Sequence, residues 1–133
     1  MKKVRWWLII VGCWYLLMVV TIFSGVIVSP EAFPTFWGPS PRLSGFPMAL
    51  TYLTLGLLML YFSRDPARAS VLVLTVALIE LVAWGSFNLI GFIRGGFELP
   101  IPRVIWLFTH CIIGVSGLLF YKLSASATRA GTG

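Results

Sequence analysis

Apolar residues form four long runs along the chain, and short polar segments separate them. The runs extend over about residues 4–28, 43–62, 70–93 and 104–121. Each is close to the roughly 20 residues with which a helix crosses a hydrocarbon core of about 30 Å. Because a helix satisfies its own backbone hydrogen bonds, it is the form that such a run takes in lipid. The pattern therefore predicts four transmembrane helices.

The segments between the runs indicate how the helices are connected. Those at 63–69 and 94–103 are short, so successive helices are expected to be antiparallel. The first, at 29–47, contains five prolines, which interrupt regular helix. We expect it to form a turn-rich cap at the outer surface, either as a connector or as a binding rim. The predicted fold is an all-α four-helix transmembrane bundle, up-down-up-down, forming a single domain over 1–123, followed by a disordered tail at 124–133.

The composition agrees with a membrane protein. Of the 133 residues, 59% are hydrophobic and 11% are charged, which is too little charge to cover the surface of a soluble domain. The net charge of +6 would indicate nucleic-acid binding in a soluble protein. Here the ten Lys and Arg flank the apolar runs and form no basic patch, so we expect a lipid bilayer as the surroundings and no nucleic-acid partner.

The basic residues also predict an orientation, because the cytoplasmic ends of membrane helices are enriched in Lys and Arg. Seven of the ten fall on the side of the termini and the second connection, and three fall on the other side. The seven are Lys2, Lys3, Arg5, Arg64, Arg68, Lys122 and Arg129, and the three are Arg42, Arg94 and Arg103. The N and C termini are therefore predicted to be cytoplasmic, in a multi-pass membrane protein.

The third run contains a single acidic residue, Glu80. A helix that begins near Ser70 and rises 1.5 Å per residue places Glu80 roughly 15 Å along its axis, near the middle of the membrane. An ionised carboxylate at this depth is costly, so Glu80 is expected to be protonated or to have a partner. Trp84 and Asn88 follow at helical spacing on the same face, and the opposite face is Leu, Val, Ile and Phe. The polar face should contact protein, and the apolar face should contact lipid.

The fourth run contains the only histidine of the chain, His110, on one helical face with Trp106. In an antiparallel arrangement His110 lies about level with Trp84, between Glu80 and Asn88. We therefore predict a hydrogen bond from His110 to Glu80 or to Asn88. Four polar residues of the first two runs are expected to complete a small polar core: Tyr15, Thr21, Thr51 and Thr54.

Four residues thus form the candidate ligand-binding set: Glu80, Trp84, Asn88 and His110. The set has two interpretations. Polar side chains hold membrane helices together, at about 0.6 kcal/mol per hydrogen bond. Ionisable residues inside a membrane also mark ligand sites and proton pathways. We assign no catalytic residue, metal or cofactor, because one His and two distant Cys cannot supply the four ligands of a zinc site.

Two stretches resemble a known family. The opening MKKVRWWLIIVGCWYLL and the later LTVALIELVAWG, with its Glu inside the third run, are similar to the BphX-like proteins. The resemblance implies a small bacterial integral membrane protein with four spans, DoxX-like in general architecture. It implies no particular activity, cofactor or catalytic residue.

Three functions of different classes remain open, in this order. The first is a non-enzymatic accessory or interaction protein that contacts a membrane protein partner. The second is a binder of a small apolar or lipid-like ligand between the helices near Glu80 and His110, or an enzyme in which one of them transfers a proton. The third is a proton-coupled transporter that acts as a homodimer. The space around Glu80 distinguishes them: a packed face favours the first, a pocket the second and a water-filled passage the third.

Overall fold

The computed structural model describes the backbone of residues 1–28, 41–94 and 101–130, and side chains over most of these ranges. Nearly all of this described part is helical, which confirms the predicted all-α class. By contacts the chain divides into two compact units, Arg5–Arg64 and Met1–Val4 with Asp65–Gly133. Each unit is described separately below.

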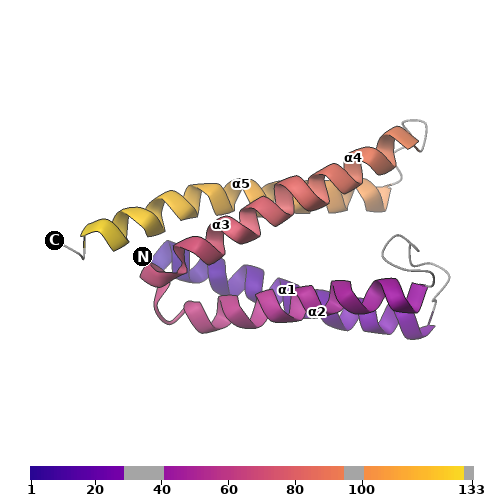
Figure 1. Ribbon diagram of the computed structural model, residues 1–133, viewed down its shortest axis with the longest axis horizontal. Coiled ribbons are helices and arrows are strands. Elements are labelled where there is room, and N and C mark those ends of the chain that lie inside the picture. The colour runs from indigo at the N-terminus through magenta and orange to yellow at the C-terminus, as the bar shows by residue number, and fades with distance from the viewer. Residues whose placement is uncertain (29–40, 95–100, 131–133) are drawn as a thin grey trace. The chain divides into compact units, whose positions relative to one another are not determined.

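The first unit is a pair of helices, α1 (Lys2–Val28) and α2 (Pro41–Phe62) (Figure 1). They are antiparallel and meet closely at two glycines. A Cβ atom on Gly12 would lie 3.2 Å from the carbonyl oxygen of Gly56, and one on Gly56 would lie 3.1 Å from that of Gly12. Small residues allow such close approach of membrane helices. One turn away, Tyr15 and Tyr52 are buried and pack edge to face with centroids 5.0 Å apart.

The start of α2 lies two residues before the predicted start of the second apolar run near residue 43, and it falls inside the proline-rich connection. The proline-rich connection was expected to extend to residue 47, but the helix begins at Pro41 and contains Pro47 in its second turn. A proline at a helix start loses no hydrogen bond, because the first amide groups of a helix have no internal partner. Pro47 does remove one bond, and membrane helices tolerate such a loss when neighbouring groups compensate. The part of the connection at 29–40 lies outside the described residues.

The predicted polar core of the first two runs is wrong for three of its members, Thr21, Thr51 and Thr54, which are all exposed. Thr21 donates to the carbonyl of Leu17 at 3.0 Å, and Thr51 donates to that of Pro47 at 2.9 Å. Both threonines are exposed. A threonine hydroxyl can bond to the preceding turn of its own helix, which satisfies it without any partner from another helix.

The second unit begins with a 3₁₀ turn, η3 (Pro66–Ala69), and a long helical stretch made of three elements. These elements are α3 (Ser70–Leu78), a π-helical segment η4 (Ile79–Trp84) and α4 (Gly85–Arg94). The last helix, α5 (Ile101–Ala130), packs antiparallel to α3 and η4 (Figure 1). Gly114 permits this packing, because a Cβ atom there would lie 2.8 Å from Leu81 Cδ2 and 3.3 Å from the carbonyl oxygen of Ala77.

The C-terminal segment also differs from the prediction. Residues 124–130, expected to belong to a disordered tail, continue α5 to Ala130. Ser124 is fully buried and its hydroxyl donates to the carbonyl of Pro66 at 2.8 Å, which ties α5 to the start of the unit. Ser126 donates to the carbonyl of Lys122 within the helix. The small polar residues of this segment were the reason for predicting disorder. In the structure the same kind of residue packs closely and donates hydrogen bonds to backbone carbonyl groups. Residues 131–133 lie outside the described part.

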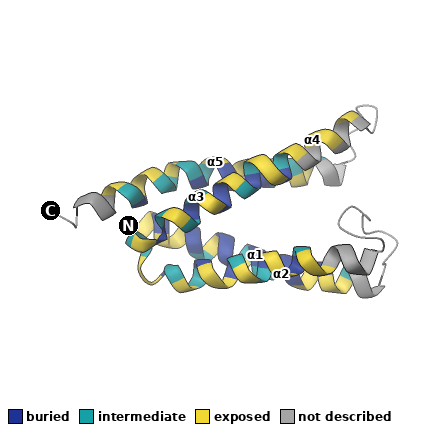
Figure 2. Cartoon of the chain, in the orientation of Figure 1, coloured by how far each residue is buried: buried dark blue, intermediate teal, exposed yellow. Residues whose placement is uncertain are grey.

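Three helical stretches among the described residues are long and apolar enough to cross a membrane: Lys2–Gly25, Pro66–Trp84 and Val104–Ser126. The apolar part of α2 that the structure describes, Phe46–Phe62, is shorter. In both units, large apolar side chains are exposed along the helices (Figure 2). Water would disfavour such surfaces, whereas lipid tails match them.

Replacing Gly114 by Val should destabilise the second unit, since the new side chain would collide with Leu81. Overpacking of this kind costs about 1–3 kcal/mol. The measurement is thermal unfolding of the purified protein in detergent or nanodiscs. The matched control is Gly85→Ala, because a Cβ atom at Gly85 meets nothing closer than the Glu80 carbonyl oxygen at 3.7 Å. Equal stability of Gly114→Val and wild type would show that the close approach at Gly114 is absent.

Candidate functional site

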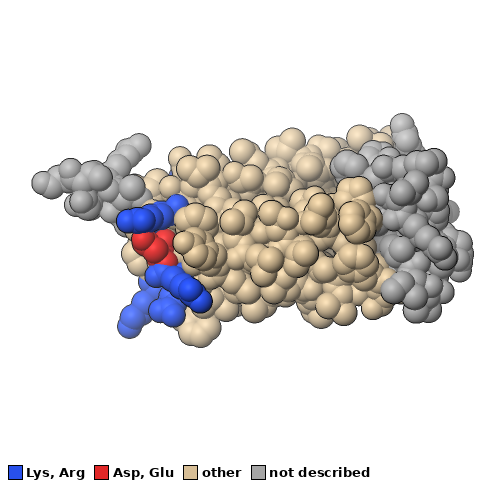
Figure 3. All heavy atoms as spheres, turned by 60° about the horizontal axis from the view of Figure 1, so that its bottom comes forward, with Lys and Arg blue, Asp and Glu red and all other residues tan. Residues whose placement is uncertain are grey.

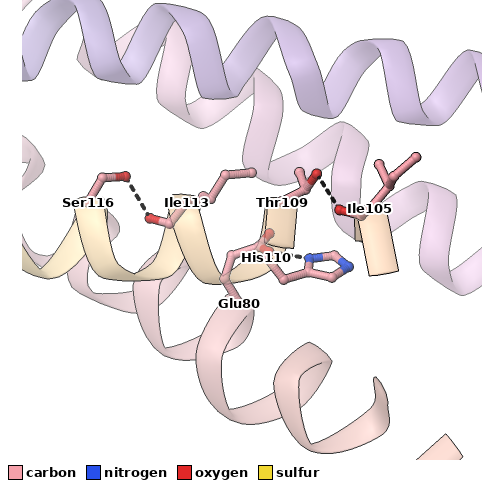
Figure 4. Close-up of polar contacts among 6 residues, drawn as sticks. All are labelled: Glu80, Ile105, Thr109, His110, Ile113 and Ser116. Atoms are coloured by element: carbon pink, nitrogen blue, oxygen red, sulfur yellow. Dashed lines mark hydrogen bonds and ion pairs between the residues drawn. The ribbon is translucent and has the colours of Figure 1, made fainter. Parts of the chain in front are cut away.

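A buried pair of ionisable side chains joins η4 to α5. Glu80 Oε2 and His110 Nδ1 are 2.5 Å apart, a short hydrogen bond (Figure 4). Glu80 is 1% exposed and His110 is 6% exposed, so the pair is removed from solvent. The structure thus confirms the predicted contact of His110 and selects Glu80 as its partner.

The helix that carries Glu80 is not a regular α-helix at this point. The amide of Gly85 bonds to the carbonyl of Glu80, five residues earlier, instead of four. Such a π turn encloses one more residue than an α turn does, and these segments occur frequently at functional sites. Periodicity in the sequence gave no sign of it, because apolar residues surround Glu80 on both sides and the run fits an α-helix equally well.

Two tryptophans fix the plane of the imidazole ring. The Trp84 ring lies nearly parallel to the His110 ring, with centroids 5.7 Å apart and an angle of 12°. The Trp106 ring lies at 5.8 Å and 22°. Trp84 is buried, and Trp106, one turn before His110, is 37% exposed. Offset stacking of this kind adds to the stability gained from burial and restricts rotation of the imidazole.

The second nitrogen of His110 is left available. In Figure 4 it lies on the far side of the ring from Glu80. None of the described residues forms a hydrogen bond to Nε2. Every fully buried nitrogen or oxygen atom of the described side chains has a hydrogen bond. Because Nε2 has none, it is not fully buried and contributes to the small exposed fraction of His110. The imidazole is therefore anchored at one nitrogen and open at the other.

The predicted site is assembled in large part. Glu80, Trp84 and His110 come together, and Asn88 lies in α4, but its side chain is outside the described residues. Trp106 belongs to the cluster and was missing from the candidate set. Its position four residues before His110 on the same helical face was the available signal. Trp106 lies near the end of the span, where tryptophan commonly anchors a helix at the membrane interface. That interpretation accounted for Trp106 in the sequence and left its contact with His110 unpredicted.

Two hydroxyl groups near the pair donate to carbonyl groups of their own helix. Thr109 donates to the carbonyl of Ile105 at 2.9 Å, and Ser116 donates to that of Ile113 at 3.1 Å, so both bond within α5 (Figure 4). The Glu80–His110 hydrogen bond joins η4 to α5. The arrangement can hold the two helices together, orient the imidazole, and present Nε2 to a further group.

Comparisons with family models, curated proteins and solved structures find no match to the chain. The resemblance to BphX-like proteins therefore stays a prediction.

A double-mutant cycle with Glu80→Leu and His110→Leu should give a coupling energy of about 0.6–1.7 kcal/mol, the range measured for hydrogen bonds between membrane helices. The bond between the two side chains is lost once either partner changes, so the second substitution should add little. Thermal unfolding in nanodiscs measures each variant. Thr109→Ala is the control, because its hydroxyl bonds only within α5 in the described structure. Additive effects of the two substitutions would contradict the coupling.

Proposed function

We propose that this chain is a small multi-pass protein of a bacterial inner membrane that binds a small apolar or lipid-like molecule at His110. The observation that carries the proposal is the open Nε2 of an imidazole that is 6% exposed and fixed by Glu80 at its other nitrogen. Ligand sites combine apolar walls with a few placed polar groups. Trp84, Trp106 and the apolar helices supply the walls, and Nε2 supplies the polar group.

The open nitrogen favours ligand binding over a purely structural role. A polar nitrogen that faces apolar surroundings has no water to bond to, and none of the described residues supplies a hydrogen-bonding partner to Nε2. The pair does hold η4 against α5, and this agrees with an accessory or interaction protein. An accessory role, however, gives no function to the Nε2 nitrogen. A proton-coupled transporter working as a dimer would need a second copy and a path for protons, and it ranks behind the other two.

The proposal includes four spans with both termini in the cytoplasm, and the distribution of charge supports it. In the first unit, Arg5 lies at the start of α1 and Arg64 follows the end of α2. In the second unit, Arg68 lies in η3 and Lys122 lies in the last third of α5, at the level of the 3₁₀ turn. In the view of Figure 3, charged side chains gather at such helix ends and the long apolar surfaces carry none. Basic residues concentrate on the cytoplasmic side.

The topology predicts that green fluorescent protein fused after residue 133 fluoresces, because the tag folds in the cytoplasm. Alkaline phosphatase inserted in the connection at 29–40 should be active, because this enzyme needs an oxidising compartment. If instead the fluorescent protein is fluorescent in the 29–40 connection and the phosphatase is active at the C terminus, the orientation is the opposite of the proposed one.

Ligand binding predicts that the purified protein carries a compound which depends on His110. Wild type, His110→Phe and Thr109→Ala are purified in parallel, and their organic extracts are compared by mass spectrometry. We expect a small molecule or lipid species at least about tenfold enriched in wild type and Thr109→Ala over His110→Phe, since one buried hydrogen bond is worth about that factor. Identical extracts from all three proteins would refute ligand binding and support the accessory role.

A further inference from the structure

We propose that the second unit binds an anionic phospholipid at the end where η3 contacts the last turns of α5. The headgroup phosphate contacts three lysines, Lys2, Lys3 and Lys122, and an acyl chain lies along one exposed face of α5. This surface is separate from the cluster around His110, so it does not depend on the ligand proposed there.

One face of α5 is apolar and exposed along most of the helix. Its five side chains are each more than half exposed and follow one another at spacings of three and four residues: Ile105, Phe108, Ile112, Val115 and Leu119. Such spacing places them in one stripe on the helix surface. The next position of the series is Lys122, which is also exposed. The same helix face therefore offers an apolar stripe and, at its end, a positive charge.

Lys122 lies beside the 3₁₀ turn at the start of the unit. Two residues after it, Ser124 is fully buried and its hydroxyl donates to the carbonyl of Pro66, the first residue of η3, at 2.8 Å. This bond fixes the level of α5 relative to η3. Arg68 of the same turn is exposed as well. Basic side chains of two elements thus share one end of the unit.

Lys2 and Lys3 belong to this end too. By contacts, Met1–Val4 is part of the second unit together with the segment that contains η3 and α5. In Figure 1 the N terminus lies at the end of the unit where η3 leads into α3. Both lysines are exposed. All three lysines of the chain are therefore accessible at one end of the second unit.

The lysines have no ion-pair partner among the described residues. The acidic side chain at this end, Asp65, is paired with Arg68 at 3.0 Å, and Glu80 is buried in its contact with the imidazole. The chain has two further acidic residues. In the sequence, Glu31 follows the last residue of α1 and Glu98 precedes the first residue of α5, whereas the lysines belong to the other ends of these helices. Three positive charges are thus open to an external anion.

A phospholipid whose phosphate bears an uncompensated charge matches both parts of this surface. A lysine ammonium is a compact charge with three N–H donors, and it binds phosphate oxygens strongly. Its long stem lies along apolar surface while the charge reaches the headgroup level. The stripe on α5 matches an acyl chain, which a free phosphate lacks. A zwitterionic lipid carries its own ammonium beside the phosphate, so it gains less from the lysines.

The experiment is carbon-13 magnetic resonance of the full chain in nanodiscs, after methylation of its amino groups with [¹³C]formaldehyde, which retains the positive charge. The chain contains three lysines, and the loss of a signal in each Lys→Arg variant assigns it. The probe is dioleoyl phosphatidylglycerol in rising fraction, within nanodiscs of dioleoyl phosphatidylcholine, which has the same acyl chains. We expect all three lysine signals to shift with phosphatidylglycerol and to reach a plateau.

A charge-removing variant tests the contribution of Lys122. Lys122→Gln should raise the fraction of phosphatidylglycerol at which the Lys2 and Lys3 signals are half shifted by about fivefold, the size expected for one basic residue near anionic lipid. The matched control is Arg42→Gln, which removes one positive charge at the start of α2, on the predicted opposite side of the membrane, and should leave this fraction unchanged.

Three outcomes would overturn the proposal. They are lysine signals that do not respond to phosphatidylglycerol, equal effects of Lys122→Gln and Arg42→Gln, and a saturating shift with sn-glycerol 3-phosphate, which has the phosphate without acyl chains. Both the first and the third are measured on wild type, so they do not depend on whether a variant folds. None of them bears on the extracts that test ligand binding at His110.

Discussion

The contact between Glu80 Oε2 and His110 Nδ1 is the constraint on which the second unit depends. A carboxyl group in the middle of an apolar helix needs a hydrogen-bonding partner, and the only basic side chain that α5 offers within its apolar run is His110. The two helices must therefore approach at this level. The same antiparallel register brings the Ser124 hydroxyl to the carbonyl of Pro66. The Glu80–His110 bond and this second bond thus belong to one alignment of α5 against the first part of the unit.

Close approach at the pair has two local requirements. Gly114 leaves room for Leu81 on the neighbouring helix, where any side chain would collide. The helix is π-helical from Ile79 to Trp84, and both Glu80 and Trp84 lie against His110. A π turn has poorer geometry than an α turn, and it persists where the surrounding packing stabilises it. Here the bond to His110 and the stacking of Trp84 contribute to that stabilisation.

Structure and binding are compatible uses of the same pair. Glu80 holds His110 by one nitrogen, and the two indole rings restrict its plane, so the second nitrogen has a defined direction before any ligand arrives. A group fixed in advance loses little entropy on binding, which strengthens an interaction that consists of few polar contacts. The exposed apolar surfaces of both units match the lipid surroundings that the long apolar helices indicate.

The sequence by itself determined the helical class, the approximate extent of the helices and the pairing of His110 with a polar residue on the third run. These features depend on hydrophobic length and helical period, which are local properties of the chain. Only the tertiary structure decided that Glu80 is the partner, that Trp106 joins it, and that the helix is π-helical between Ile79 and Trp84. It also decided the ends of two helices, where α2 includes Pro47 and α5 continues through Ser124. The physical reason is the same in each case: proline, serine and tryptophan are each compatible with several local structures, and contacts with residues distant in the sequence select one of them.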